Sequence, residues 1–126
     1  MTGAGRGRGD DGQAAVELAL ALPLVFVVIL GAVQVLLVAR DQIAVIHAAR
    51  EGARAAAVAA DPADEGTAAA TAATGLDGDR LSVAVADGGD HVTVTVRYAA
   101  PTDVPLVGAL VGDVTVTGTA TMRSEP

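Results

Sequence analysis

The sequence predicts an α+β protein in which a long amino-terminal helix, carrying a membrane span, precedes a small three-stranded antiparallel sheet. Three observations predict this class. The first is an uncharged run of 22 residues from Leu18 to Ala39. The second is an Ala-rich stretch over residues 41–60 that continues the helical pattern without a proline. The third is a set of runs after residue 80 in which valine alternates with small or polar residues, the period of a β-strand.

The uncharged run has the length of a membrane span. A helix rises about 1.5 Å per residue, so this run covers roughly 33 Å, against a bilayer core of about 30 Å. A domain this small has no core thick enough to bury such a helix on every side. We therefore interpret residues 13–40 as a transmembrane helix. A removed secretory signal is a competing interpretation, but its apolar region is only about 7–15 residues long.

Residues 1–12 predict a flexible leader peptide. They contain five glycines, two arginines and two aspartates, without any apolar period. Arginines flank the span on both sides, and long domains can cross a membrane largely regardless of charge. The charge pattern by itself therefore does not fix the orientation of the span.

Residues 41–60 predict a continuation of the same helix outside the membrane. Polar side chains recur on one face, at spacings of three and four, at His47, Arg50, Glu51 and Arg54. Small side chains form the opposite face, at Val45, Ala49, Gly52, Ala53, Ala56 and Ala60. A face of small residues lets another backbone approach closely. It can pack on the chain's own domain, or it can be shared between subunits.

Asp61 and Pro62 end this helix, because proline disfavours helical geometry in the residue before it. Residues 61–79 are then a linker that can hold a short second helix over residues 63–74, closed by Gly75. The abundant Ala and Thr of this stretch also fit a low-complexity linker.

Residues 80–126 predict a small β head. Alternating runs over 81–86 and 92–97 flank an Asp-Gly-Gly-Asp turn, which indicates a hairpin, and a third run covers 114–122. The stretch 101–112 is predicted to be a loop that holds an apolar patch. The valine face of the three strands is expected to pack against a helix.

Composition argues against several classes of function. The formal net charge is −7, and residues 40–126 hold six Arg against twelve Asp and Glu, so a nucleic-acid partner is not expected. The chain has no cysteine, and His47 and His91 fall in different elements. The aspartates near the hairpin fit turns better than a Ca²⁺ loop. We expect no enzyme activity, no cofactor and no metal.

Glu17 and Pro23 are the two unusual residues of the span. A charged side chain in a membrane helix costs about 2.5–3.5 kcal/mol at the centre and less near the interface. Glu17 can therefore lie at headgroup depth, or it can have a positive partner within the membrane. Pro23 removes one helical hydrogen bond, which gives either a simple kink or a bend used in packing.

The stretch from Gly12 to Val58 resembles a known family. Its segments GQAAVELALALPLVFVVILGAVQ and AAREGARAAAV closely resemble the TadE-like family, which are pseudopilins of tight-adherence (Flp) pili. The strand end Ala-Thr-Met-Arg is similar too, though less specific. The chain departs from related pilins at Leu18, where the flexible type usually has tyrosine, and at Gln13, where major type IV pilins usually begin with phenylalanine.

The resemblance implies a function in pilus assembly. A prepilin peptidase would cut between Gly12 and Gln13, and Glu17 would pair with the terminal amine of a neighbouring subunit. The leader would lie in the cytoplasm, and residues 40–126 outside the cytoplasmic membrane. Implied partners are membrane lipid, the peptidase and other pilus subunits, in a homo- or hetero-oligomer. Its candidate interface face comprises Ala49, Arg50, Glu51, Gly52, Ala53 and Arg54.

Two functions of other classes stay open from the sequence. The first is a membrane-tethered module whose extracytoplasmic head binds a ligand. The second is a secreted protein from which the span has been removed. The identity of the mature amino terminus distinguishes all three hypotheses.

Overall fold

The structure, a computed structural model, describes residues 6–125, with side chains from residue 9 onward. Its elements, in chain order, are α1 (Arg6–Val58), α2 (Pro62–Thr74), the 3-10 turn η1 (Gly78–Arg80), β1 (Leu81–Asp87), β2 (His91–Ala100), α3 (Val107–Val111) and β3 (Val114–Arg123). This confirms the predicted α+β class, with one long apolar helix, a second helix and a three-stranded antiparallel sheet.

Helix α1 is a single unbroken helix of 53 residues. The sequence predicts a flexible leader as far as Gly12, but the helix already begins at Arg6, and residues 1–5 lie outside the described part. Residues 6–12 are helical because extending an existing helix adds one hydrogen bond for each residue that is fixed. At its other end α1 stops at Val58, since Asp61 before Pro62 is extended, with φ −118° and ψ 90°.

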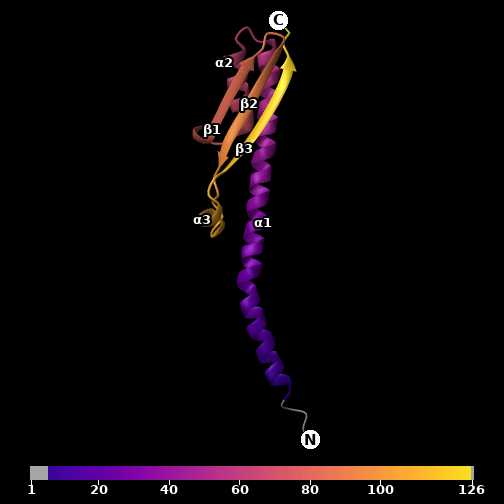
Figure 1. The fold of residues 1–126 in the computed structure, drawn as a ribbon, viewed down its shortest axis with the longest axis vertical. Coiled ribbons are helices and arrows are strands. Elements are labelled where there is room, and N and C mark those ends of the chain that lie inside the picture. Colours follow the sequence, from indigo (N-terminus) through magenta and orange to yellow (C-terminus); the bar gives the residue numbers. More distant parts are fainter. Residues whose placement is uncertain (1–5, 126) are drawn as a thin grey trace.

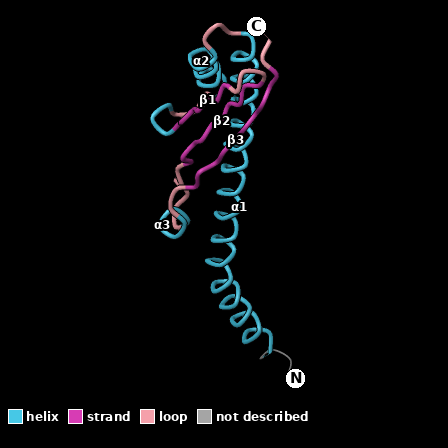
Figure 2. Tube along the Cα trace, turned by 45° about the horizontal axis from the view of Figure 1, so that its top comes forward, coloured by secondary structure: helices cyan, strands magenta, loops and turns pink. Residues whose placement is uncertain are grey.

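Helix α2 confirms the predicted second helix. The Asp61 side chain accepts a hydrogen bond from the Asp64 amide at 3.3 Å, and Pro62 opens the first turn. Gly75 ends the helix in the left-handed conformation, with φ 63°. The helix runs back along α1, as Figure 2 shows.

The strands form a meander in the order β1-β2-β3. All neighbours are antiparallel, and Val94 in the central strand is opposite Val85 on one side and Ala120 on the other. The predicted alternation of valine with small or polar residues places different side chains on the two faces of the sheet. The valines of β2 are fully buried on the inner face, at Val92, Val94 and Val96. On the outer face the hydroxyls of Thr93 and Thr121 are hydrogen-bonded at 2.9 Å.

Two helices cover the inner face of the sheet. The carboxyl-terminal part of α1 packs on β2 and β3, and α2 packs beside it on β1 (Figure 1). Gly118 of β3 makes close packing possible, because a Cβ there would lie 2.5 Å from the carbonyl oxygen of Val45. The amino-terminal part of α1 extends far beyond the head, curving gently (Figure 1).

The connection between β2 and β3 differs from its prediction. The sequence predicts a loop over residues 101–112, but five of these residues form the short helix α3. The α3 helix lies below the sheet, beside the part of α1 that leaves the head (Figures 1 and 2). Val107 and Val111 of this stretch border a cleft against α1, whereas Leu106 and Leu110 are exposed.

Candidate functional site

The structure places the predicted processing site within α1. Gly12 and Gln13 are exposed, and a Cβ at Gly12 would have nothing within 4 Å. A peptidase must approach the backbone closely at an extended residue, and in this structure Gly12 is helical. A cut here therefore needs the first turns of α1 to unwind, which glycines make easier because each lowers helix stability by about 1 kcal/mol relative to alanine.

Glu17 lies just before the apolar part of α1 and is exposed. From Glu17 to Arg40 the helix rises about 35 Å, which is close to the thickness of a bilayer core. Glu17 takes part in none of the ion pairs formed among the described side chains, residues 9–125. Its position thus marks one edge of an apolar band, and Arg40 marks the other.

Pro23 lies inside α1 without ending it. It has no amide hydrogen and so breaks one bond of the helical ladder. The lower part of α1 is curved, as Figure 1 shows.

The segment 49–54 is divided between the core and the surface. Ala49 and Ala53 are fully buried in the head, and Gly52 is buried with them. Arg50 and Arg54 are exposed on the other side of the helix. The chain's own head thus covers the small residues, and only the charged part of the predicted interface face remains accessible.

The small residues of the segment 49–54 are covered because α1 and α2 cross closely at two glycines. A Cβ at Gly52 would lie 2.9 Å from the carbonyl oxygen of Gly66 and 3.1 Å from a methyl of Val94. A Cβ at Gly66 would lie 3.1 Å from the methyls of Ala56 and Val85. Gly66 was not selected from the sequence, where it sits in an Ala- and Thr-rich run. Its position relative to the Gly75 cap does not indicate that it packs against another helix.

The exposed charges of this segment form one weak pair. Arg54 and Glu51 are 3.6 Å apart, and the Arg54 side chain is 72% exposed. Exposed pairs three residues apart in a helix contribute only a few tenths of a kcal/mol. Arg50 and Arg54 therefore remain available to a partner surface.

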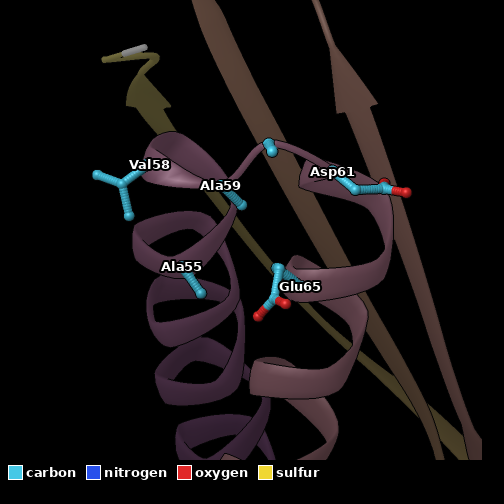
Figure 3. Close-up of a pocket in the computed structure, with 6 residues that line it drawn as sticks. Ala55, Val58, Ala59, Asp61 and Glu65 are labelled. Atoms are coloured by element: carbon cyan, nitrogen blue, oxygen red, sulfur yellow. The ribbon is translucent and has the colours of Figure 1, made fainter.

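An open pocket of about 450 Å³ lies at the far end of the head, between the end of α1 and the start of α2. Figure 3 shows Ala55, Val58 and Ala59 on one wall, with the Glu65 carboxylate reaching between the two helices. Asp61 borders the pocket but is used as the cap of α2. The lining offers no nucleophile with an adjacent base, and within the described part of the chain no group of three or more His, Asp or Glu is placed to hold a metal ion.

Gln34 was also not selected from the sequence. It is only 6% exposed, and neither atom of its amide has a hydrogen-bond partner among the described residues. The available signal was that Gln34 is the one polar side chain between Leu18 and Ala39. Sequence alone could not show what buries it.

These features define the class of the protein. It has an α+β head on a single helix long and apolar enough to cross a membrane. Only 6% of the most apolar window of that helix is buried, whereas the core helix of a soluble protein is mostly buried. The class is therefore a helix-anchored head with one candidate membrane span.

Comparison with known proteins gives a family match over part of the chain. Residues 12–54, the segment that holds Gly12, Glu17 and Arg54, match the family model described as TadE-like protein. The match confirms the resemblance and includes both the apolar stretch and the glycine crossing at Gly52. Neither a curated protein nor a solved structure matches the chain.

Proposed function

We propose that this chain is a pilin-like, TadE-type membrane protein that acts in assembly of a tight-adherence (Flp, type IV-like) pilus. A prepilin peptidase cuts it between Gly12 and Gln13. The span then lies in the cytoplasmic membrane, with the head outside. The role is structural, with lateral packing of helices in the membrane and a small head that sets the geometry of docking.

The observation that carries this proposal is the position of Glu17. It is exposed at the start of an apolar helix, five residues after Gly12, within the TadE-like match. After the cut, Gln13 would carry a free amine, a cation about 6 Å from Glu17 along the helix axis. The amine of one subunit and the carboxylate of its neighbour would then form an ion pair in a region where lipid cannot solvate either charge.

The proposal is tested by the mass of the membrane-extracted protein. We expect an amino terminus at Gln13 in cells that contain the peptidase and an intact leader in cells that lack it. The control variant is Gly9→Ala, which changes a leader glycine but leaves the junction intact, and it should be cut normally. An intact leader in the first cells would contradict the proposal.

A membrane-tethered ligand-binding module is the second candidate. The open pocket at the end of α1 favours it, because two carboxylates and an apolar wall border the same space. If the chain is such a module, its leader stays uncut, and Glu65→Ala lowers its affinity for the ligand. Processing at Gln13 together with normal behaviour of Glu65→Ala would count against it.

A further inference from the structure

We propose that the loop around α3 is a second membrane contact, which inserts its apolar side chains between the acyl chains of the outer leaflet beside α1. This inference rests on the proposed membrane span. It places α3, which has no role in the proposed pilus function, at the membrane.

Two uncharged stretches, distant in the sequence, lie side by side in the structure. The first is Leu18–Ala39 in α1, and the second covers residues 104–112 around α3. They meet at a cleft of about 400 Å³ with an almost wholly apolar lining, formed by Gly31, Gln34, Val35, Val38, Val107, Val111 and Val114. Charged residues border both stretches on the head side, at Arg40, Asp41, Asp103 and Asp113.

The depth of α3 follows from the rise of α1. Val38 is two residues below Arg40 and Gly31 is nine below it, which corresponds to about 3 Å and about 14 Å along the helix. Interfacial helices bury their apolar face about 5–10 Å into the boundary between headgroups and acyl chains. If Arg40 lies at the membrane surface, the part of α1 that faces α3 covers this range of depths.

The exposed side chains of the loop are solvated better by lipid than by water. Leu110 is 84% exposed and Leu106 is 63% exposed, although both are large and apolar. Val111 is exposed beside them. The backbone of Leu106 has φ 69° and ψ −40°, a conformation that residues other than glycine rarely adopt. The loop thus keeps a strained backbone that presents leucine outward.

The loop also pairs part of its own backbone, which favours insertion. The Gly108 amide donates to the Val104 carbonyl at 3.0 Å, and the Gly112 amide donates to the Gly108 carbonyl at 3.3 Å. The Thr102 hydroxyl donates to the carbonyl of Gly112 and so joins the two ends of the loop. Each pairing removes a polar group that would otherwise face hydrocarbon at a cost of several kcal/mol.

Gln34 supports the same placement independently. It is the one polar side chain of the apolar stretch, and it is buried at the cleft where α3 meets α1. An unpaired amide facing acyl chains is unfavourable. Covering by α3 removes this amide from the lipid, so the loop shields the span at its single polar position.

The test uses single tryptophans, because the chain has no tryptophan of its own. Leu110→Trp reports on the loop, Leu24→Trp on the span, and Val58→Trp on the far end of the head. All three positions are exposed and apolar, so the substitutions leave the head core intact. The full chain is reconstituted at low density into phosphatidylcholine vesicles, with or without lipid brominated on the upper part of the acyl chain.

We expect Leu110→Trp to emit at short wavelength and to lose most of its emission in brominated vesicles. Val58→Trp should keep its emission, since it lies about 27 Å beyond Arg40 along the helix. Long-wavelength, unquenched emission from Leu110→Trp, with quenching of Leu24→Trp by bromine placed deeper, would overturn the loop proposal and leave the span intact. Short-wavelength but unquenched emission would mean that protein covers the loop, which also overturns it. Absence of quenching at Leu24→Trp would instead contradict the span itself.

Discussion

At the scale of single residues, the polar side chain inside the apolar stretch of α1 and the one at its edge differ in their surroundings. Glu17 stands exposed at one end, whereas Gln34 is buried well inside the stretch. A neutral amide can be covered by the chain's own loop at moderate cost. A carboxylate needs water, headgroups or a cation, so its place is the edge of the membrane or a contact with another subunit.

Glu17→Ala should therefore separate insertion from assembly. We expect the variant to insert as well as the parent or better, because a charge is removed, and to reduce the number of pili on the host cell strongly. Resistance of the protein to alkaline extraction measures insertion, and microscopy measures pili. The control is Glu65→Ala in the head, which should leave both unchanged. A normal number of pili in Glu17→Ala would exclude the pairing role of the carboxylate.

Tyr98 makes the head sensitive to alkaline pH. Its side chain is 6% exposed, and burial raises the pKa of its hydroxyl above the ordinary value of 10.0, with the carboxylate of Asp41 adding to the effect. A raised pKa means that the folded state holds the proton more tightly. The stability is then fully present below pH 10 and is lost as the pH rises through the raised pKa.

Tyr98→Phe should remove this loss of stability at alkaline pH. The chain has one tyrosine, no cysteine and no lysine, so Tyr98 is the one side chain that titrates near pH 10. We expect the midpoint of denaturant unfolding to fall above this pH in the parent and to stay level in the variant. The same fall in both proteins would show that the loss has another source.

At the scale of elements, the head depends on the crossing of α1 and α2. Gly52 and Gly66 let the two backbones come close enough for both helices to rest on the valine face of the sheet. Gln42 fixes α1 to β3 through a hydrogen bond from its amide to the Thr117 carbonyl, 2.8 Å long. The family segment thus contains part of the head's packing as well as the span.

Gly52→Val should push the two helices apart. Overpacking of a core costs about 1–3 kcal/mol, and here the obstacle includes backbone, which cannot rotate away. Denaturant unfolding of the full chain in detergent, followed by circular dichroism, measures the change. Gly31→Ala is the control in the same helix, since a Cβ there meets nothing within 4 Å, and it should not destabilise the protein. Equal stability of the parent and Gly52→Val would contradict the importance of this crossing.

At the scale of the whole molecule, the core and the span are separate. The buried cluster runs from Val45 to Val116, and the most apolar window of α1 contributes almost nothing to it. The core is also thin, because it is built of valine and alanine with one tyrosine. The apolar half of α1 is therefore free to cross a membrane, while the head folds on the other half of the helix.

A chain of residues 40–126 should accordingly fold without the span. We expect a water-soluble α+β domain with a cooperative unfolding transition and a stability of about 5 kcal/mol or less, at the low end for small domains. Calorimetry and circular dichroism measure this. The same fragment carrying Val94→Asp should lose the transition, because a charge would enter the core. A parent fragment without cooperative unfolding would show that the span is needed for folding.

The sequence by itself determined the elements and the class of this protein. An uncharged run of membrane length, an Asp-Pro helix end, a Gly cap and the valine-threonine alternation each act through local geometry or solvation, so the apolar stretch 18–39, a second helix over 63–74 and the three strands could be predicted directly. The sequence also identified the TadE-like segment.

Only the tertiary structure decided which faces meet. The small face of α1 fits a partner subunit or its own domain equally well in sequence, and the packing of Gly52 against Gly66 settled this in favour of the head. The loop over residues 101–112 and Gln34 are far apart in the chain, and their meeting depends on the length of β2 and β3. Local patterns specify the conformation of a segment, whereas a contact between distant segments depends on how all the elements pack together.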